Sequence, residues 1–335
     1  MTTTEPATRP TATPAPARRR LRPGAVELFV GVLVVAVLLR GWLVGATNSA
    51  RVQTWLTIFV SIVIQATPFV VLGTVVSAAI AALVPPSFFA RALPRRPVLA
   101  VPVAGVAGVV LPGCECGSVP IAGALVRRGV TPAAALAFLL SAPAINPVVL
   151  VATFVAFPGR PQMVVARLVA SLAASVVMGW LWLRLGRTEW LRVPDRPELA
   201  GLGKGAAFVA ACRTDLVQAG GYLVIGGFTA ATLNVAVPQK LLHAVGGQPV
   251  LSVLALGFLA VVLSICSEAD AFVAASLTQF SWTARLAFLV VGPMVDAKLF
   301  AMQAGAFGRR FAVRFAPATF VVAVLAAVAV GAVLL

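Results

Sequence analysis

The chain alternates between long apolar runs and short polar connections. Nine runs, most of them 20 to 30 residues long and rich in Ala, Val and Leu, follow one another along the sequence. A helix of about 20 apolar residues spans the hydrocarbon core of a bilayer, and backbone polar groups in lipid must pair within their own segment. The pattern therefore predicts membrane helices at residues 26–44, 54–84, 98–126, 133–157, 162–183, 208–237, 249–280, 283–304 and 311–335.

Composition also places the chain in lipid. Hydrophobic residues make up 60% of the 335 positions and charged residues 11%, which is too apolar for a soluble domain with a single core. The net charge of +16 raises the question of nucleic acid, but the basic residues lie in the connections, where they set the orientation of a membrane protein. We expect the lipid bilayer as a partner and no nucleic acid.

Polar segments divide the chain into five parts. Residues 1–23 are rich in Arg, Pro and Thr and predict a disordered cytoplasmic tail, and residues 24–50 predict an N-terminal transmembrane anchor. Residues 51–183 and 208–335 form two apolar halves, which a hydrophilic cytoplasmic linker at 184–207 separates. We expect a multi-pass protein of the cell membrane with its N-terminus in the cytoplasm.

The two halves resemble each other. The match keeps an offset of 153 positions at first and of 150 further on, and it includes polar, Pro and Gly positions that a skewed composition does not explain. Internal repeats are common in transporters. The matched pairs include Gln65 with Gln218, Gly73 with Gly226, Cys116 with Cys266, and Asn146 with Asp296.

Whether the repeats are parallel or inverted depends on segments 98–126 and 249–280, each of which either crosses the membrane or enters it and returns. Re-entry keeps the clusters of Arg and Lys on the cytoplasmic side, so positive charge favours re-entry. Each half then crosses an odd number of times. The predicted fold is all-α and polytopic, with about seven to nine transmembrane helices in two inverted pseudo-symmetric repeats, each with a broken or re-entrant helical segment.

Residues 111–120 break an apolar segment with two prolines, two glycines and a carboxylate. Non-helical backbone at membrane depth is tolerated where it lines a cavity or is buried in protein, so this break predicts a site or gate, with a helix starting near Ser118. Glu115 costs about 2–4 kcal/mol in a membrane segment and needs a partner or a function. The alternative is a structural carboxylate that caps the broken backbone.

Cys114 and Cys116 form a C-x-C pair. Thiolates are soft donors that suit soft metals or trivalent arsenic, while the alternative for both residues is tight packing. The cysteines of this chain do not show the spaced pattern of a secreted, disulfide-bonded scaffold.

The second half carries a related break. Cys266, Ser267, Glu268 and Asp270 place two carboxylates and a thiol within about one helical turn, and carboxylates this close share protons or a cation.

Asn146 and Asp296 mark a second pair of breaks, each beside a proline motif, and predict unwound helices that face the hairpins. Lys298 lies two positions after Asp296. Because residues two apart do not share a helix face, we expect Lys298 to pair with Asp270, Glu268 or Glu115, either as a resting ion pair that opens or as a permanent one.

These motifs resemble the predicted permease family that includes the ArsP-type organoarsenical efflux permeases. The resemblance covers roughly residues 50–335 and rests on residues 112–120, 146–147, 266–270 and 292–298. It implies a permease of the cytoplasmic membrane and, in its arsenical branch, export of trivalent organoarsenicals. It further implies Cys114, Cys116 and Cys266 as ligands for a soft metalloid, and Glu115, Glu268 and Asp270 as coupling acids.

The leading hypothesis is a secondary transporter, coupled to protons, for a small-molecule or metalloid substrate. The alternatives are a channel or structural subunit of a membrane complex, and an intramembrane thiol oxidoreductase. We expect no enzyme activity and no cofactor. The sequence leaves open whether the chain forms a homo-oligomer. The candidate residues for transport and substrate binding are Cys114, Glu115, Cys116, Ser118, Asn146, Cys266, Ser267, Glu268, Asp270, Asp296 and Lys298.

Overall fold

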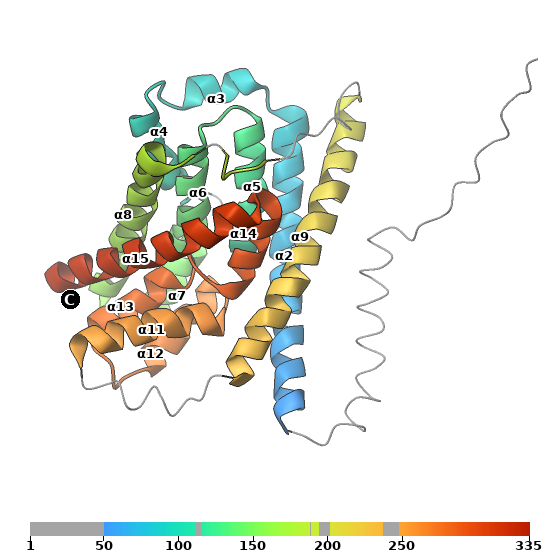
Figure 1. The fold of residues 1–335 in the computed structure, drawn as a ribbon. Helices are drawn as coiled ribbons and strands as arrows, with labels where there is room; N and C mark the ends of the chain where they lie inside the picture. The colour runs from blue at the N-terminus through green and yellow to red at the C-terminus, as the bar shows by residue number, and fades with distance from the viewer. Residues whose placement is uncertain (1–49, 111–114, 188, 194–201, 237–247) are drawn as a thin grey trace, which may run out of the picture.

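A computed structural model describes residues 50–110, 115–187, 189–193, 202–236 and 248–335, and every regular element in these ranges is a helix. The predicted tail, anchor and Cys114 lie outside the described residues, as does part of the linker. The helices in Figure 1 are α2 (Ala50–Leu83), α3 (Pro86–Ala92), α4 (Pro97–Ala107), α5 (Glu115–Arg127), α6 (Pro132–Ile145), α7 (Pro147–Ala156), α8 (Pro161–Leu185), α9 (Lys204–Ala236), α11 (Pro249–Leu263), α12 (Ser267–Ser276), α13 (Trp282–Val291), α14 (Ala297–Phe307) and α15 (Arg309–Leu334).

The prediction of an all-α polytopic membrane protein is confirmed. Within the described ranges, five stretches are long and apolar enough to cross a membrane: 50–83, 132–156, 161–185, 204–236 and 309–334. The predicted segments 98–126, 133–157, 249–280 and 283–304 each divide into two short helices. Prolines or glycines lie at three of these breaks. At the break in 249–280, Ser264 ends α11 in the left-handed conformation.

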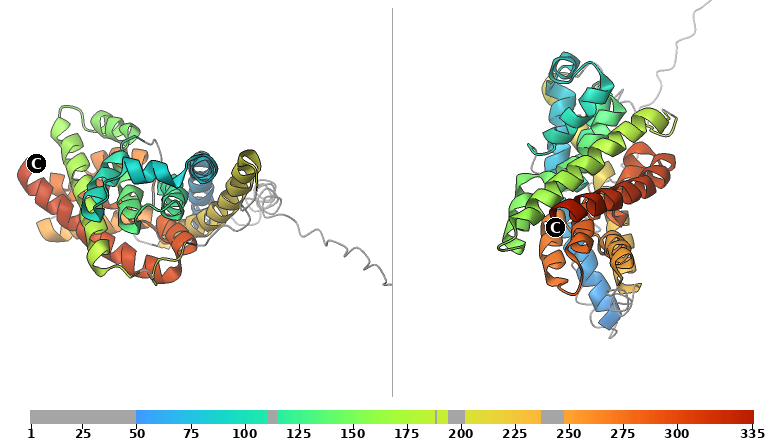
Figure 2. Two further views of the ribbon diagram at one scale, coloured as in Figure 1. Left: turned by 90° about the horizontal axis from the view of Figure 1, so that it is seen from above. Right: turned by 90° about the vertical axis from the view of Figure 1, so that its left-hand side faces the viewer.

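The second half repeats the helix order of the first. A long helix, four short helices and a second long helix form each half, namely α2 with α4 to α8 and α9 with α11 to α15. The two leading helices lie side by side and antiparallel: the Trp55 indole donates a hydrogen bond to Thr232 at one end, and Ser77 donates one to Asp215 at the other. The closing helices α8 and α15 cross each other (Figure 2). The repeats are therefore inverted.

The first broken segment returns to the side from which it enters. Ala100 near the start of α4 and Leu125 near the end of α5 belong to one apolar cluster, which also includes Ile80 at the end of α2. Both outer ends of the α4–α5 hairpin thus lie beside the end of α2. This is the re-entrant arrangement that positive charge favours, and it leaves the start of α5 buried in the protein.

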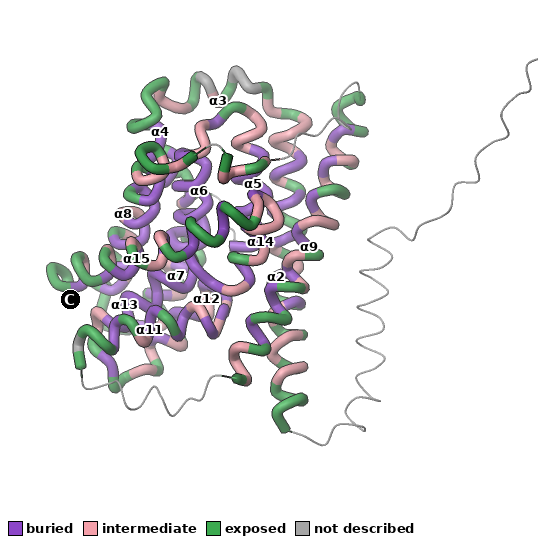
Figure 3. The backbone as a smooth tube through the Cα atoms, viewed as in Figure 1, coloured by how far each residue is buried: buried purple, intermediate pink, exposed green. Residues whose placement is uncertain are grey.

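The buried centre is formed by α6 and its counterpart α13. Every residue of α6 from Ala133 onward is buried, as is every residue of α13 from Ala284 onward, whereas the long helices keep one face exposed (Figure 3). Apolar side chains on that exposed face, such as Ile64 and Leu325, suit lipid.

Repeat-related glycines let helices approach closely. A Cβ atom on Gly73 would contact the Gly117 backbone, and one on Gly226 would lie 2.7 Å from the Cα of Lys298. Small residues at helix interfaces allow backbones to come together in membranes. These two positions therefore fix where α2 meets α5 and where α9 meets α14.

Substituting Gly226 by Ala should push α14 away and lower the free energy of unfolding by about 1–3 kcal/mol, because the backbone of Lys298 cannot rotate aside. Gly221 is the matched control, since it lies on the same helix with open space around it, so Gly221→Ala should be neutral or slightly stabilising. Unfolding in detergent measures both. Equal stability of the two variants would contradict this packing.

Candidate functional site

Four short helices begin near one another at the junction of the two halves. They are α5, α7, α12 and α14, and α5 packs on α14 while α7 packs on α12, so each contact joins one half to the other. Asn146 accepts a hydrogen bond from the Val149 N–H (2.9 Å) and Asp296 from the Leu299 N–H (2.5 Å), which caps α7 and α14 in the same way. The repeat-related pair thus satisfies the backbone at both breaks.

A buried ion pair joins the halves. The Lys298 ammonium lies 2.7 Å from Oε1 of Glu115, and the Ser267 hydroxyl donates to Oε2 at 3.1 Å. Both members of the pair are almost completely shielded. Glu115 of the first half is therefore held by two residues of the second.

Lys298 also contacts Asp296, at 3.3 Å. The expectation that these two residues do not pair was wrong, because it assumed that both lie on one helix. Asp296 precedes α14 with an extended backbone (φ −144°, ψ 172°), so its carboxylate can serve both the helix N-terminus and the Lys298 ammonium.

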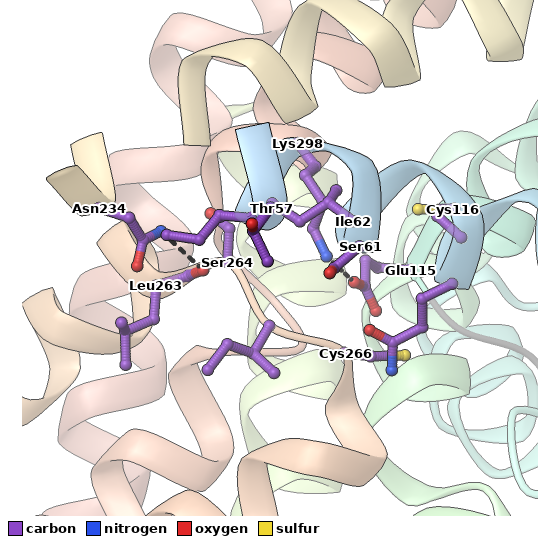
Figure 4. Close-up of a pocket in the computed structure, with 14 residues that line it drawn as sticks. Thr57, Ser61, Ile62, Glu115, Cys116, Asn234, Leu263, Ser264, Cys266 and Lys298 are labelled. Carbon is purple, nitrogen blue, oxygen red and sulfur yellow. Dashed lines mark hydrogen bonds and ion pairs between the residues drawn. The ribbon is translucent and has the colours of Figure 1, made fainter. Parts of the chain in front are cut away.

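A cavity of about 260 Å3 opens beside this pair (Figure 4). The predicted residues Glu115, Cys116, Cys266 and Lys298 all lie on its wall, and α2 contributes Thr57, Ser61 and Gln65. The remaining lining residues are Ile58, Ile62, Ala66, Asn234, Leu263, Ser264 and Ile265. Both described site cysteines therefore face one space that also holds a charged pair.

The other predicted residues that the structure describes are not on the wall of this cavity. Ser118 donates to the Glu115 carbonyl one turn earlier, and α5 begins at Glu115 rather than near Ser118. Glu268 is half-buried and accepts a hydrogen bond from the Cys266 thiol at 2.7 Å. Among the described residues, which exclude Cys114, no group of three His, Cys, Asp or Glu residues forms a metal-binding cluster.

Asp270 is the least satisfied carboxylate of the site. It is 2% exposed, and its Oδ2 has no hydrogen-bond partner among the described residues. Gly292 makes room for it, since a Cβ there would lie 2.5 Å from Oδ2 and 3.3 Å from the Phe288 carbonyl oxygen. An ionised carboxylate is unfavourable in such surroundings, whereas a protonated one carries no charge.

Arg167 completes the site and was not predicted. It is fully buried, donates to the Thr153 hydroxyl at 2.7 Å and donates to the Ser267 carbonyl at 3.1 Å. It thereby ties α8 to α7 in its own half and to α12 in the other. The signal in the sequence was an arginine within the first third of apolar segment 162–183.

Comparison with known proteins finds a family model and two relatives that cover most of the chain. A family model described as "Predicted permease" matches residues 51–332. The UPF0718 protein YcgR of Bacillus subtilis is 38% identical over 278 residues, which cover 81% of this chain and 94% of that protein. A Streptococcus mutans protein whose name describes a subunit of a two-component membrane permease complex is 33% identical, with 82% and 94% covered. No solved structure matches.

Replacing Arg167 by Lys should lower the free energy of unfolding by about 1–3 kcal/mol, because Lys keeps the charge but not the planar fork that reaches two acceptors. Arg184→Lys, at an exposed position of the same helix, is the control and should change stability by less than about 0.5 kcal/mol. If both variants unfold alike, Arg167 does not tie the halves together.

Proposed function

This chain belongs to the predicted permease family, and on that premise we propose that it is a secondary transporter of the cell membrane that moves a small solute through the central cavity. The observation that carries the proposal is the Glu115–Lys298 ion pair, which lies on the cavity wall and joins inverted halves at 2.7 Å. Transporters with inverted repeats bind substrate where broken helices meet near the midplane.

The ion pair gives the proposed transporter a contact that can change during a cycle. In a low-dielectric site the pair is strong when closed, and a solute or proton that binds Glu115 competes with Lys298 for it. Asp296 offers Lys298 a second carboxylate on its own side of the junction. Lys298 can thus release Glu115 while Asp296 still compensates its positive charge. The two halves can then separate, and the cavity can open to each side in turn.

The thiols favour a soft solute. Cys116 and Cys266 face the same cavity, and Cys114 precedes Glu115 in the sequence. Thiolates bind trivalent arsenic and other soft acceptors in preference to hard ions. We therefore propose export of trivalent organoarsenicals, with the N-terminus in the cytoplasm. In this proposal the arsenical is the substrate that is transported, and it is not a resident cofactor.

Purified chain in proteoliposomes should move methylarsenite saturably, and a variant with Ser at positions 114, 116 and 266 should lose most of this flux, because hydroxyls do not replace soft sulfur ligands. Cys212→Ser, which changes a cysteine outside the cavity lining, is the control and should keep it. Equal flux through all variants would overturn thiolate binding.

Proton coupling is the second part of the proposal. Asp270 is buried beside the site, and its Oδ2 has no hydrogen-bond partner among the described residues. The charges that act on it are those of Arg167 on α8, Glu115 on α5, Lys298 on α14 and Asp296, the N-cap of α14. Glu268 lies on its own helix. A carboxyl that is held neutral in one state and meets water in the other can carry a proton across.

Asp270→Asn should keep methylarsenite exchange but lose accumulation driven by a pH gradient, because Asn is neutral and of the same shape yet cannot release a proton. The infrared band of a protonated carboxyl at neutral pH should vanish in the same variant. Glu189→Gln changes an exposed loop acid and should alter neither property. Gradient-driven accumulation in Asp270→Asn would rule out Asp270 as the proton carrier.

A subunit of a larger permease complex is the second candidate. The name of the Streptococcus mutans relative favours it, since that protein is described as one of two components. The proteoliposome assay separates the candidates, because flux through this chain alone excludes an obligatory partner. A silent chain that gains flux when a co-purified membrane protein is added would establish the complex instead.

A further inference from the structure

Two connections, one from each half, meet at one end of the molecule. The α7–α8 connection carries Phe157 and Arg160, and α13 begins with Trp282; the Phe157 and Trp282 ring centroids lie 6.3 Å apart, edge to face. Helices α7 and α13 each have 10 residues, so each extends about 15 Å from its broken end. Half of a hydrocarbon core of about 30 Å is the same length. If the junction lies at the midplane, this end reaches the lipid headgroups.

Two arginines share one indole there. The Cζ atoms of Arg160 and Arg285 lie 4.2 and 4.4 Å from the ring centroid of Trp282. Cation–π contacts position both guanidinium groups, and they fix them as neighbours in spite of their like charge. Arg160 belongs to the first half of the chain and Arg285 to the second, so this pair of charges lies across the boundary between the repeats.

The pair has no counter-ion in the part of the chain that the structure describes. Neither arginine forms an ion pair there, and the charge that acts most directly on Arg285 is that of Arg160. Arg285 is only 5% exposed, and its buried Nε has no hydrogen-bond partner among the described residues. A buried, unpartnered donor beside a second cation is a local environment that an anion would complete.

The surface that leads to this pair is apolar. Val148, Val151 and Val155 follow one face of α7 at spacings of three and four, and all are more than half exposed, as is Phe154 beside them. In a membrane this strip faces acyl chains. A phosphate held by the arginines would therefore belong to a molecule whose apolar tails can lie along α7, which describes a phospholipid better than a free anion.

We propose that Arg160, Trp282 and Arg285 form a binding site for the phosphate of an anionic phospholipid. The lipid bridges the α7–α8 connection of the first half to the start of α13 in the second half. The site is separate from the central cavity and does not depend on what the permease transports. Its ligand chemistry is a phosphate monoanion, which both a phosphatidylglycerol headgroup and inorganic phosphate present.

Native mass spectrometry of the purified full chain tests the site, with phosphatidylglycerol, phosphatidylcholine and inorganic phosphate as separate probes. We expect phosphatidylglycerol to bind and to raise the unfolding temperature, with phosphatidylcholine weaker and inorganic phosphate without effect. Arg285→Gln and Arg160→Gln should each weaken phosphatidylglycerol binding about tenfold or more, because each removes a charge-assisted contact.

Arg160 is exposed, so Arg160→Gln tests the site even if Arg285→Gln fails to fold. Arg51→Gln, at an exposed arginine in the first turn of α2, is the control and should bind phosphatidylglycerol like the unmodified chain. Phosphatidylglycerol binding that survives both glutamine variants would overturn the site. An equal response to inorganic phosphate, lost in the same variants, would overturn lipid as the ligand.

Discussion

The cost of a charge in lipid governs this fold. A single carboxylate or ammonium at the centre of a membrane helix is unfavourable by about 2.5–3.5 kcal/mol on insertion scales. Glu115 and Lys298 compensate each other's charge, since the Lys298 ammonium lies 2.7 Å from Oε1 of Glu115. The pair forms only if α5 of the first half and α14 of the second begin at the same place. Both helices must therefore be short, and both segments must be broken at that depth.

Each break leaves backbone N–H and C=O groups without helical partners, and lipid cannot form hydrogen bonds with them. Short-range polar contacts within the protein stabilise the breaks instead. Asn146 and Asp296 cap α7 and α14, Ser267 holds the second oxygen of Glu115, and Arg167 reaches the Ser267 carbonyl. The same residues that stabilise the breaks thus also shape the charged wall of the cavity. Support and proposed function thus share one network, in which Oδ2 of Asp270 has no hydrogen-bond partner among the described residues.

The sequence predicted much of this from a few residues. Apolar runs and the offsets of 153 and 150 indicated two related halves, and the positive charge of the connections indicated that they are inverted. The prolines and glycines around Cys116 and the carboxylates after Cys266 indicated the breaks. The partners of Lys298 were only partly predictable, because helix periodicity does not describe a capping residue such as Asp296. Arg167 and the lining residues of α2 could not be assigned, since their role depends on contacts between segments far apart in the chain.

The central claim is that one buried pair couples the two halves, and a double-mutant cycle of Glu115→Gln and Lys298→Met measures that coupling directly. Unfolding free energies in a bilayer mimetic should fall by about 3–5 kcal/mol for each single variant, because each leaves a buried charge with less compensation. The double variant should lose clearly less than the sum, since neither charge is then present. Additive losses would contradict the pair as the link between the halves.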